Sequence, residues 1–164
     1  MIKQLNISML TMLGLGFSKF APGTVASFVT CLIYICFYNY QINILLLILC
    51  VALIIIFSAY SIDTYKDSFS KIDAKEIVID EFIGQSIPVL TIYSFIEKNN
   101  LTHFILYSFI SFVLFRLFDI FKPYPISKVD KEMKNGFGVI LDDILAGLYT
   151  SLVIFIIIFL RNDV

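Results

Sequence analysis

The feature that most limits how this chain can fold is an uncharged run of about 21 residues, Ile42 to Ile62. A helix of this length, at about 1.5 Å per residue, crosses the roughly 30 Å hydrocarbon core of a bilayer. Hydrophobic residues make up 59% of the chain and charged residues 15%, against about 45–50% and 25% in soluble domains. A soluble bundle of 164 residues could not bury so much apolar surface. We therefore expect lipid to surround most of the chain.

Four further segments are predicted to be membrane-embedded helices: Val25–Tyr40, Ile77–Ile96, Leu101–Phe121 and Val139–Leu160. The first is expected to begin near Thr24, a plausible N-cap after the break at Pro22. The second is the weakest, because Asp80 and Glu81 open it and Pro88 should kink it. The predicted fold is all-α, a single domain over residues 1–164, forming a polytopic helical membrane bundle with about four to five membrane-embedded helices.

The distribution of basic residues predicts how the bundle is oriented. If five segments cross in turn, one side carries nine lysines: Lys3, Lys19, Lys66, Lys71, Lys75, Lys122, Lys128, Lys131 and Lys134. The other side carries Lys98 and Arg161. Because lysine and arginine are enriched in cytoplasmic loops, the lysine-rich side is predicted to face the cytoplasm.

Charged residues inside the predicted spans gather at that same lysine-rich side. They begin or end three different helices: Asp80, Glu81, Arg116, Asp119, Asp142 and Asp143. Ionisable residues within membrane segments are costly and mark functional sites by default. Any one pair could simply be solvated at headgroup depth, but charges at random interfacial positions would populate both sides. The clustering therefore predicts one site.

The site carries more negative than positive charge. Five carboxylates face only Arg116 and Lys122, and crowded carboxylates repel one another or take up protons. A hard divalent cation resolves this, and ligands that are all oxygen suit magnesium better than zinc. We therefore expect Mg2+ at this site.

A glycine-rich stretch before the first span predicts an anion-binding partner for the metal. Backbone N–H groups exposed at Gly14, Gly16 and Gly23, followed by a helix N-terminus at Thr24, could cradle a phosphate. Lys19 could add a positive charge, although a solvated lysine is the commoner case. Together with the carboxylates, this stretch predicts metal-assisted phosphate chemistry, with water or an aspartate as the nucleophile.

The sequence resembles the phosphatidylglycerophosphatase A family of bacterial membrane lipid phosphatases. The matching blocks are Gly14-Leu-Gly16, Ala21-Pro-Gly-Thr24, Ser27, Asp80-Glu-Phe-Ile-Gly84, Phe115-Arg-Leu-Phe-Asp119-Ile-Phe-Lys-Pro123-Tyr-Pro125, Asp130, Gly136-Phe-Gly138 and Leu141-Asp-Asp-Ile-Leu-Ala-Gly147. Family members often have tryptophan at two positions that here are Ile79 and Tyr124, and the chain has no tryptophan. This departure predicts altered anchoring at the interface rather than lost chemistry.

The resemblance implies Mg2+-dependent hydrolysis of phosphatidylglycerophosphate to phosphatidylglycerol and inorganic phosphate, at the cytoplasmic face of the bacterial inner membrane. The predicted metal ligands are Asp80, Glu81, Asp142 and Asp143. Asp119 is expected either to complete the metal shell or to orient Arg116, which would clamp phosphate oxygens. Lys122 and the loop residues Gly14, Gly16, Lys19, Gly23 and Thr24 are predicted to hold the rest of the headgroup.

Two other classes of function fit the same carboxylates. One is a small cation transporter or channel, although no matching polar path continues through Ile42–Ile62. The other is a non-catalytic assembly subunit whose charges make helix contacts. A nucleic-acid partner is not expected, because the net charge is −1 and no basic stripe is present. The three cysteines lie in apolar runs and are expected to be small hydrophobic residues.

Overall fold

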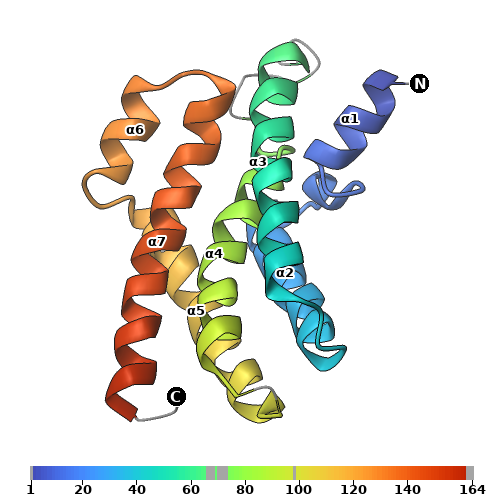
Figure 1. Cartoon of the computed structure of the whole chain (residues 1–164). Helices are drawn as coiled ribbons and strands as arrows, with labels where there is room; N and C mark the ends of the chain where they lie inside the picture. Colours follow the sequence, from blue (N-terminus) through green and yellow to red (C-terminus); the bar gives the residue numbers. More distant parts are fainter. Residues whose placement is uncertain (1, 66–68, 70–73, 98, 162–164) are drawn as a thin grey trace.

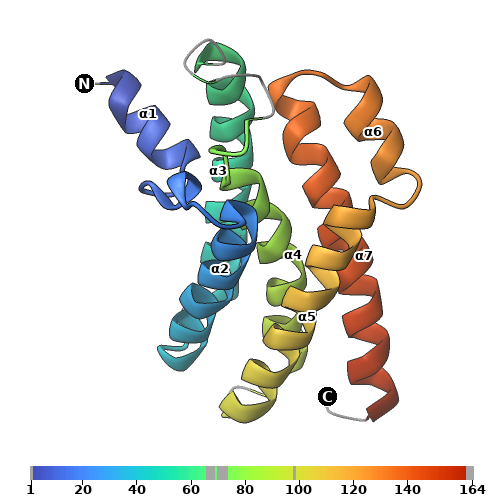
Figure 2. The same cartoon turned by 180° about the vertical axis from the view of Figure 1, so that it is seen from behind.

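The computed structural model describes residues 2–65, 69, 74–97 and 99–161, and within these ranges every regular element is helical (Figures 1 and 2). The elements are α1 (Ile2–Leu10), η1 (Leu15–Phe17), α2 (Pro22–Asn39), α3 (Ile44–Tyr65), α4 (Ile79–Phe95), α5 (Leu101–Phe121), α6 (Ile126–Glu132) and α7 (Gly136–Arg161). Of these helices, α2, α3, α5 and α7 are long and apolar enough to cross a membrane. The prediction of an all-α membrane bundle is confirmed.

Helix α4 lies at the centre of the bundle, because it packs against α2, α3, α5 and α7 (Figure 1). Its neighbours shield it from lipid, so its sequence can carry Gln85 and Ser86, both fully buried. In contrast, only 22% of the most apolar window of α3 is buried inside the protein. Protein contacts in place of lipid explain why α4 has the weakest hydropathy signal of the five long helices.

The closest packing in the bundle joins α4 to α7. A Cβ atom added at Gly147 would lie 2.3 Å from the carbonyl oxygen of Gly84, and one added at Gly84 would lie 2.7 Å from the carbonyl oxygen of Asp143. Pro88 has no N–H to donate to the carbonyl of Gly84 four residues earlier, so that oxygen faces the neighbouring helix instead. Glycines let helix backbones approach this closely in membranes. This approach brings the two acidic ends of α4 and α7 together.

One local expectation was wrong. Helix α2 begins at Pro22 rather than near Thr24, with Ala21 as its N-cap at φ 41°. Proline is favoured in the first helical turn, where its missing N–H would have no partner, so the Pro22-Gly23 pair starts the helix instead of breaking the chain. Helix α4 runs from Ile79 to Phe95 and includes Pro88, where the expected kink stays a prediction. The short helices α1 and α6 lie outside the predicted spans.

The five long helices run in alternating directions, so both ends of the bundle are defined (Figure 2). The end that holds the start of α4 and the end of α5 also holds all seven of the described lysines, which lie in or next to α1, α2, α4, α5 and α6: Lys3, Lys19, Lys75, Lys122, Lys128, Lys131 and Lys134. Arg161 ends α7 at the opposite end. The predictions for Lys66, Lys71 and Lys98 lie outside the described residues.

Candidate metal centre

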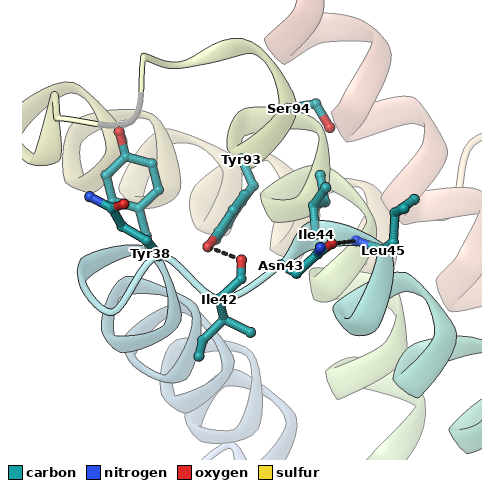
Figure 3. Close-up of a pocket in the computed structure, with 8 residues that line it drawn as sticks. Tyr38, Ile42, Asn43, Ile44, Leu45, Tyr93 and Ser94 are labelled. Carbon is teal, nitrogen blue, oxygen red and sulfur yellow. Dashed lines mark hydrogen bonds between the residues drawn. The ribbon is translucent and has the colours of Figure 1, made fainter.

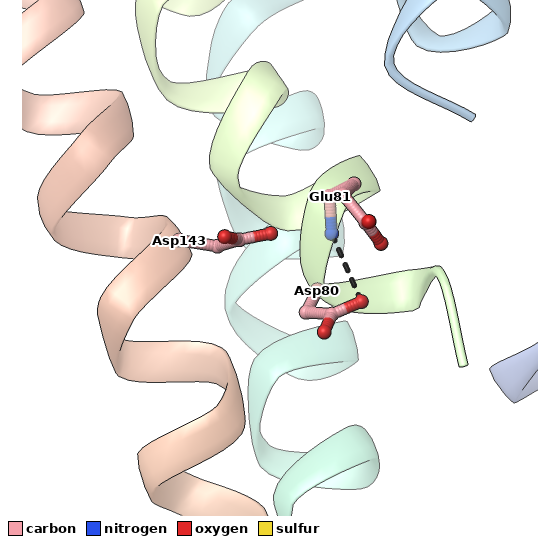
Figure 4. A group of neighbouring side chains, drawn as sticks. All are labelled: Asp80, Glu81 and Asp143. Atoms are coloured by element: carbon pink, nitrogen blue, oxygen red, sulfur yellow. Dashed lines mark hydrogen bonds between the residues drawn. The ribbon is translucent and has the colours of Figure 1, made fainter. Parts of the chain in front are cut away.

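Three carboxylates from two helices converge at the lysine-rich end of the bundle. Asp80 and Glu81 lie in the first turn of α4, and Asp143 faces them from α7 (Figure 4). One oxygen from each lies within 4.8 Å of the others. Asp80 is 8% exposed and Asp143 4%, so water screens neither charge well. This spacing suits three oxygen ligands around one cation.

The electrostatics of this cluster are unbalanced. Among the described residues, Arg116 is the only basic side chain within ion-pair distance of the three carboxylates. Its Nη1 lies 3.9 Å from Oε1 of Glu81. The second oxygen of Glu81, Oε2, is buried without a hydrogen-bond partner. Burying carboxylates that lack positive partners is costly, whereas a divalent cation would offset both the desolvation and the mutual repulsion. The residues therefore fit a hard metal ion such as Mg2+.

Arg116 presents unused donors beside the carboxylates. Its Nη1 lies 2.8 Å from Oδ2 of Asp119, three residues further along α5. Its Nε is buried and has no hydrogen-bond partner. An unpaired guanidinium N–H next to a metal-type cluster is suited to a phosphate oxygen, since guanidinium matches phosphate in a two-pronged geometry. Asp119 forms an ion pair with the guanidinium, and its predicted role in orienting Arg116 stays a prediction.

Lys122 connects two carboxylates on a different side of the site. Its Nζ donates to Oδ1 of Asp130 at 2.8 Å and to Oδ2 of Asp142 at 2.6 Å. Burial lowers the pKa of Lys122, but the hydrogen bonds to Asp130 and Asp142 outweigh it, and the pKa lies above its ordinary value. Lys122 therefore stays charged and draws Asp142 away from the three-carboxylate group, which does not include it.

The glycine-rich stretch is divided between two places. Gly23 belongs to the site, because a Cβ there would lie 1.9 Å from Oε1 of Glu81 and 3.2 Å from Nη1 of Arg116. Gly16 instead packs on the chain before α4, where a Cβ would lie 1.9 Å from the carbonyl oxygen of Glu76. Gly14 caps η1 at φ 96°, and Lys19 is exposed. Thr24 is half-buried in the first turn of α2. The headgroup-binding roles predicted for these five residues stay predictions.

Two residues near the site had no role in the sequence analysis. Asp130 of α6 is the second partner of Lys122. Gln85, one turn after Glu81, is fully buried, and its Nε2 donates to Oγ of Ser111 at 3.1 Å while its Oε1 has no partner. An amide inside an apolar helix was a visible signal, but nothing in the sequence paired it with Ser111.

A cavity of about 430 Å³ lies at the opposite end of the bundle, around the α2–α3 connection (Figure 3). The Tyr93 hydroxyl donates to the carbonyl oxygen of Ile42 at 2.6 Å on its wall. The described residues that line it include no Asp, Glu, Lys or Arg: Tyr38, Gln41, Ile42, Asn43, Ile44, Leu45, Tyr93 and Ser94. This cavity lies apart from the carboxylate cluster.

Comparison with known proteins finds a matching family and several relatives. The family model described as Phosphatidylglycerophosphatase A matches residues 8–158. A protein of Bacteroides thetaiotaomicron named "Putative phosphatidylinositol-3-phosphatase" is 34% identical over 144 residues, which cover 86% of each chain. Proteins named "Phosphatidylglycerophosphatase A" from Haemophilus influenzae and Escherichia coli are 41% and 33% identical over 85 residues. Those two alignments cover 52% of this chain and 47% and 45% of the relatives. No solved structure matches the chain significantly.

Proposed function

Because the chain belongs to the phosphatidylglycerophosphatase A family and is a phosphatase, we propose that it hydrolyses phosphatidylglycerophosphate to phosphatidylglycerol and inorganic phosphate. The observation that carries this proposal is the meeting of Asp80, Glu81 and Asp143 beside the unpaired Nε of Arg116. A carboxylate cluster and a guanidinium at one end of a membrane bundle suit a phosphate ester held at headgroup depth. The acyl chains of such a substrate stay in the bilayer.

The proposed cofactor is Mg2+, held by Asp80, Glu81 and Asp143. Asp142 is a further ligand only if its carboxylate leaves Lys122. Bound Mg2+ would neutralise charge on the phosphate and make the phosphorus a better electrophile. The close approach of α4 and α7 at Gly84 and Gly147 keeps the three carboxylates together.

The remaining steps use the chain's own side chains. Arg116, oriented by Asp119, donates to phosphate oxygens and stabilises the charge that builds up during transfer. Water attacks the phosphorus, and a carboxylate of the cluster takes the proton of the water. The bond between phosphorus and the ester oxygen breaks, and the departing oxygen takes up that proton to become the free hydroxyl of the lipid product. Lys122 holds Asp142 and adds positive charge where the headgroup would lie. An aspartate nucleophile is the alternative to water.

The site is proposed to face the cytoplasm of a bacterial inner membrane. In support, the described lysines concentrate at the end of the bundle that carries the carboxylates, and Arg161 lies at the other end. This asymmetry follows the positive-inside rule. It matches a headgroup that is presented from the cytoplasmic leaflet.

A second substrate is a phosphoinositide with phosphate at the 3 position. The relative from Bacteroides thetaiotaomicron carries that activity in its name, and it aligns with 86% of this chain. Both substrates are phosphate monoesters on a lipid headgroup, so the same metal and guanidinium would serve either. What differs is the group that bears the phosphate, glycerol or inositol.

Phosphate release from purified protein separates these possibilities. The protein is assayed in mixed micelles with phosphatidylglycerophosphate, phosphatidylinositol 3-phosphate or phosphatidic acid, with Mg2+ or with a chelator. The proposal predicts fastest release from phosphatidylglycerophosphate, and only with Mg2+. Faster release from phosphatidylinositol 3-phosphate would favour the second substrate. No release from any of the lipids, together with Mg2+ flux into proteoliposomes, would favour the transporter class.

A further inference from the structure

The N-terminal segment carries a series of exposed apolar side chains. They recur every three or four residues through α1 and the turn that follows it, and we call them the N-terminal stripe: Leu5, Met9, Leu13, Phe17 and Phe20. Leu13 is 88% exposed and Phe20 83%. Large apolar side chains grouped this way are unfavourable in water and mark an interaction surface.

Other residues of the same segment fix it to the protein. Leu10 is fully buried, and its carbonyl oxygen accepts a hydrogen bond of 3.0 Å from the backbone N–H of Val78. The Asn6 side chain donates to the Tyr65 hydroxyl at 3.0 Å. These contacts hold α1 and the turn in one orientation. The outward direction of the N-terminal stripe is therefore built into the fold.

The position of the stripe points to lipid as its occupant. Phe20 lies two residues before α2, and the outer surface of α2 continues with Phe28, which is 46% exposed on a candidate membrane span. Figure 2 shows α1 at the edge of the bundle, at the end where the carboxylates lie. Lys3 and Lys19 are exposed on the same segment, where they can meet anionic headgroups. An apolar row flanked by lysines is typical of a segment that lies in the membrane interface.

We propose that the N-terminal stripe is an interfacial anchor that inserts into the leaflet on the side of the carboxylate site, with Lys3 and Lys19 at the level of the lipid phosphates. This reassigns most of the segment 14–20 from phosphate binding to membrane binding. Gly23 is the member of the glycine-rich stretch that contacts the site residues. The anchor fixes the N-terminus of α2, and with it Gly23, at the depth of the lipid headgroups.

The absence of tryptophan from the sequence gives a clean test, because each introduced tryptophan is the sole one. Phe17→Trp and Phe20→Trp are reconstituted separately into phosphatidylcholine and phosphatidylglycerol vesicles. Two reference variants give the tryptophan signals expected in the hydrocarbon core and in water. Leu152→Trp replaces a side chain that is 61% exposed within α7 and reports the hydrocarbon core. Lys131→Trp replaces an exposed residue of α6 and reports water. None of these substitutions touches the carboxylate cluster.

The proposal predicts that Phe17→Trp and Phe20→Trp emit at shorter wavelength than Lys131→Trp and are quenched by brominated lipids. Bromine near the headgroup end of the acyl chain should quench them more strongly than bromine near the chain end, the reverse of Leu152→Trp. Quenching by aqueous acrylamide as strong as in Lys131→Trp would overturn the proposal. Protection from both quenchers would overturn it too, because a second protein copy rather than lipid would then cover the stripe. The readout is independent of phosphatase activity, so it can fail while the proposed function stands.

Discussion

Adding a single methyl group at Gly23 should inactivate the site while leaving the fold intact. The Cβ of Gly23→Ala would lie 1.9 Å from Oε1 of Glu81, whereas real Cβ atoms essentially never approach a neighbour closer than 3.0 Å. The carboxylate must therefore move by at least about 1.1 Å. It can do so because it is the end of a flexible side chain. A misplacement of about 1 Å at a reacting centre costs on the order of 100-fold in rate.

The Gly23→Ala variant should be as stable as the unmodified protein or slightly more stable. Replacing glycine with alanine within a helix stabilises it by about 0.5–1 kcal/mol when nothing else intervenes. We therefore expect a thermal midpoint in detergent close to that of the unmodified protein, with phosphate release reduced about 100-fold. Val25→Ala is the matched control, since it alters the same turn of α2 without adding an atom toward Glu81. It should keep its rate.

A double-mutant cycle shows whether the contact itself is responsible. Glu81→Asp withdraws the carboxylate by one methylene group. Adding Gly23→Ala to this variant should therefore reduce the rate of phosphate release much less than Gly23→Ala reduces it in the unmodified protein. Phosphate release is measured for the two single variants and the double variant under the same conditions. Full activity of Gly23→Ala, or strict additivity with Glu81→Asp, would refute the reasoning.

Three further perturbations test other contacts. Lys122→Met leaves Asp142 buried without its partner and should lower the free energy of unfolding by about 2 kcal/mol in a denaturant titration; an unchanged value would contradict the role of this pair. The hydrogen bond from Lys122 lowers the pKa of Asp130, so the stabilisation by the pair is complete above the unfolded carboxyl pKa of about 3.9 and is lost as the pH falls through the lower folded-state pKa. Asp130→Asn should remove that part of the acid sensitivity of the thermal midpoint, and equal acid sensitivity in both proteins would count against it. Gly147→Ala places a Cβ 2.3 Å from the backbone oxygen of Gly84, which cannot move aside; we expect aggregated protein in size-exclusion chromatography, and a monodisperse active variant would show that the helices can separate.

The spans were largely predictable because a bilayer imposes length and apolarity on a helix. The uncharged run of α3 was identified to within a few residues at each end, since lipid contacts most of its surface. The N-cap of α2 was not predicted, because Pro22 can either end a segment or begin a helix. The N-cap is Ala21 rather than Thr24.

The membership of the acidic cluster was predictable only in part. Adjacent residues on a helix point about 100° apart, so Asp142 and Asp143 have different neighbours, even though the adjacent Asp80 and Glu81 both reach the cluster. The sequence does not reveal which of Asp142 and Asp143 faces α4, because that depends on the rotation of α7 about its axis. The packing of Gly147 on Gly84 sets this rotation and turns Asp143 toward the cluster. Asp142 then meets Lys122. The second partner of Lys122 is Asp130 of α6, in the segment between two spans, and the hydropathy pattern does not predict where that segment lies.

In the proposed mechanism Asp80, Glu81 and Asp143 hold the Mg2+ on which phosphate release depends. The most direct test measures phosphate release from phosphatidylglycerophosphate over a Mg2+ titration, for the unmodified protein, Asp143→Asn and Glu132→Gln. Glu132 is an exposed carboxylate of α6 outside the cluster, so its variant controls for the loss of one negative charge. Release should depend on Mg2+, fall by at least about 100-fold in Asp143→Asn, and follow an unchanged titration in Glu132→Gln. Equal release by all three proteins, or release that persists in chelator, would contradict the proposed mechanism.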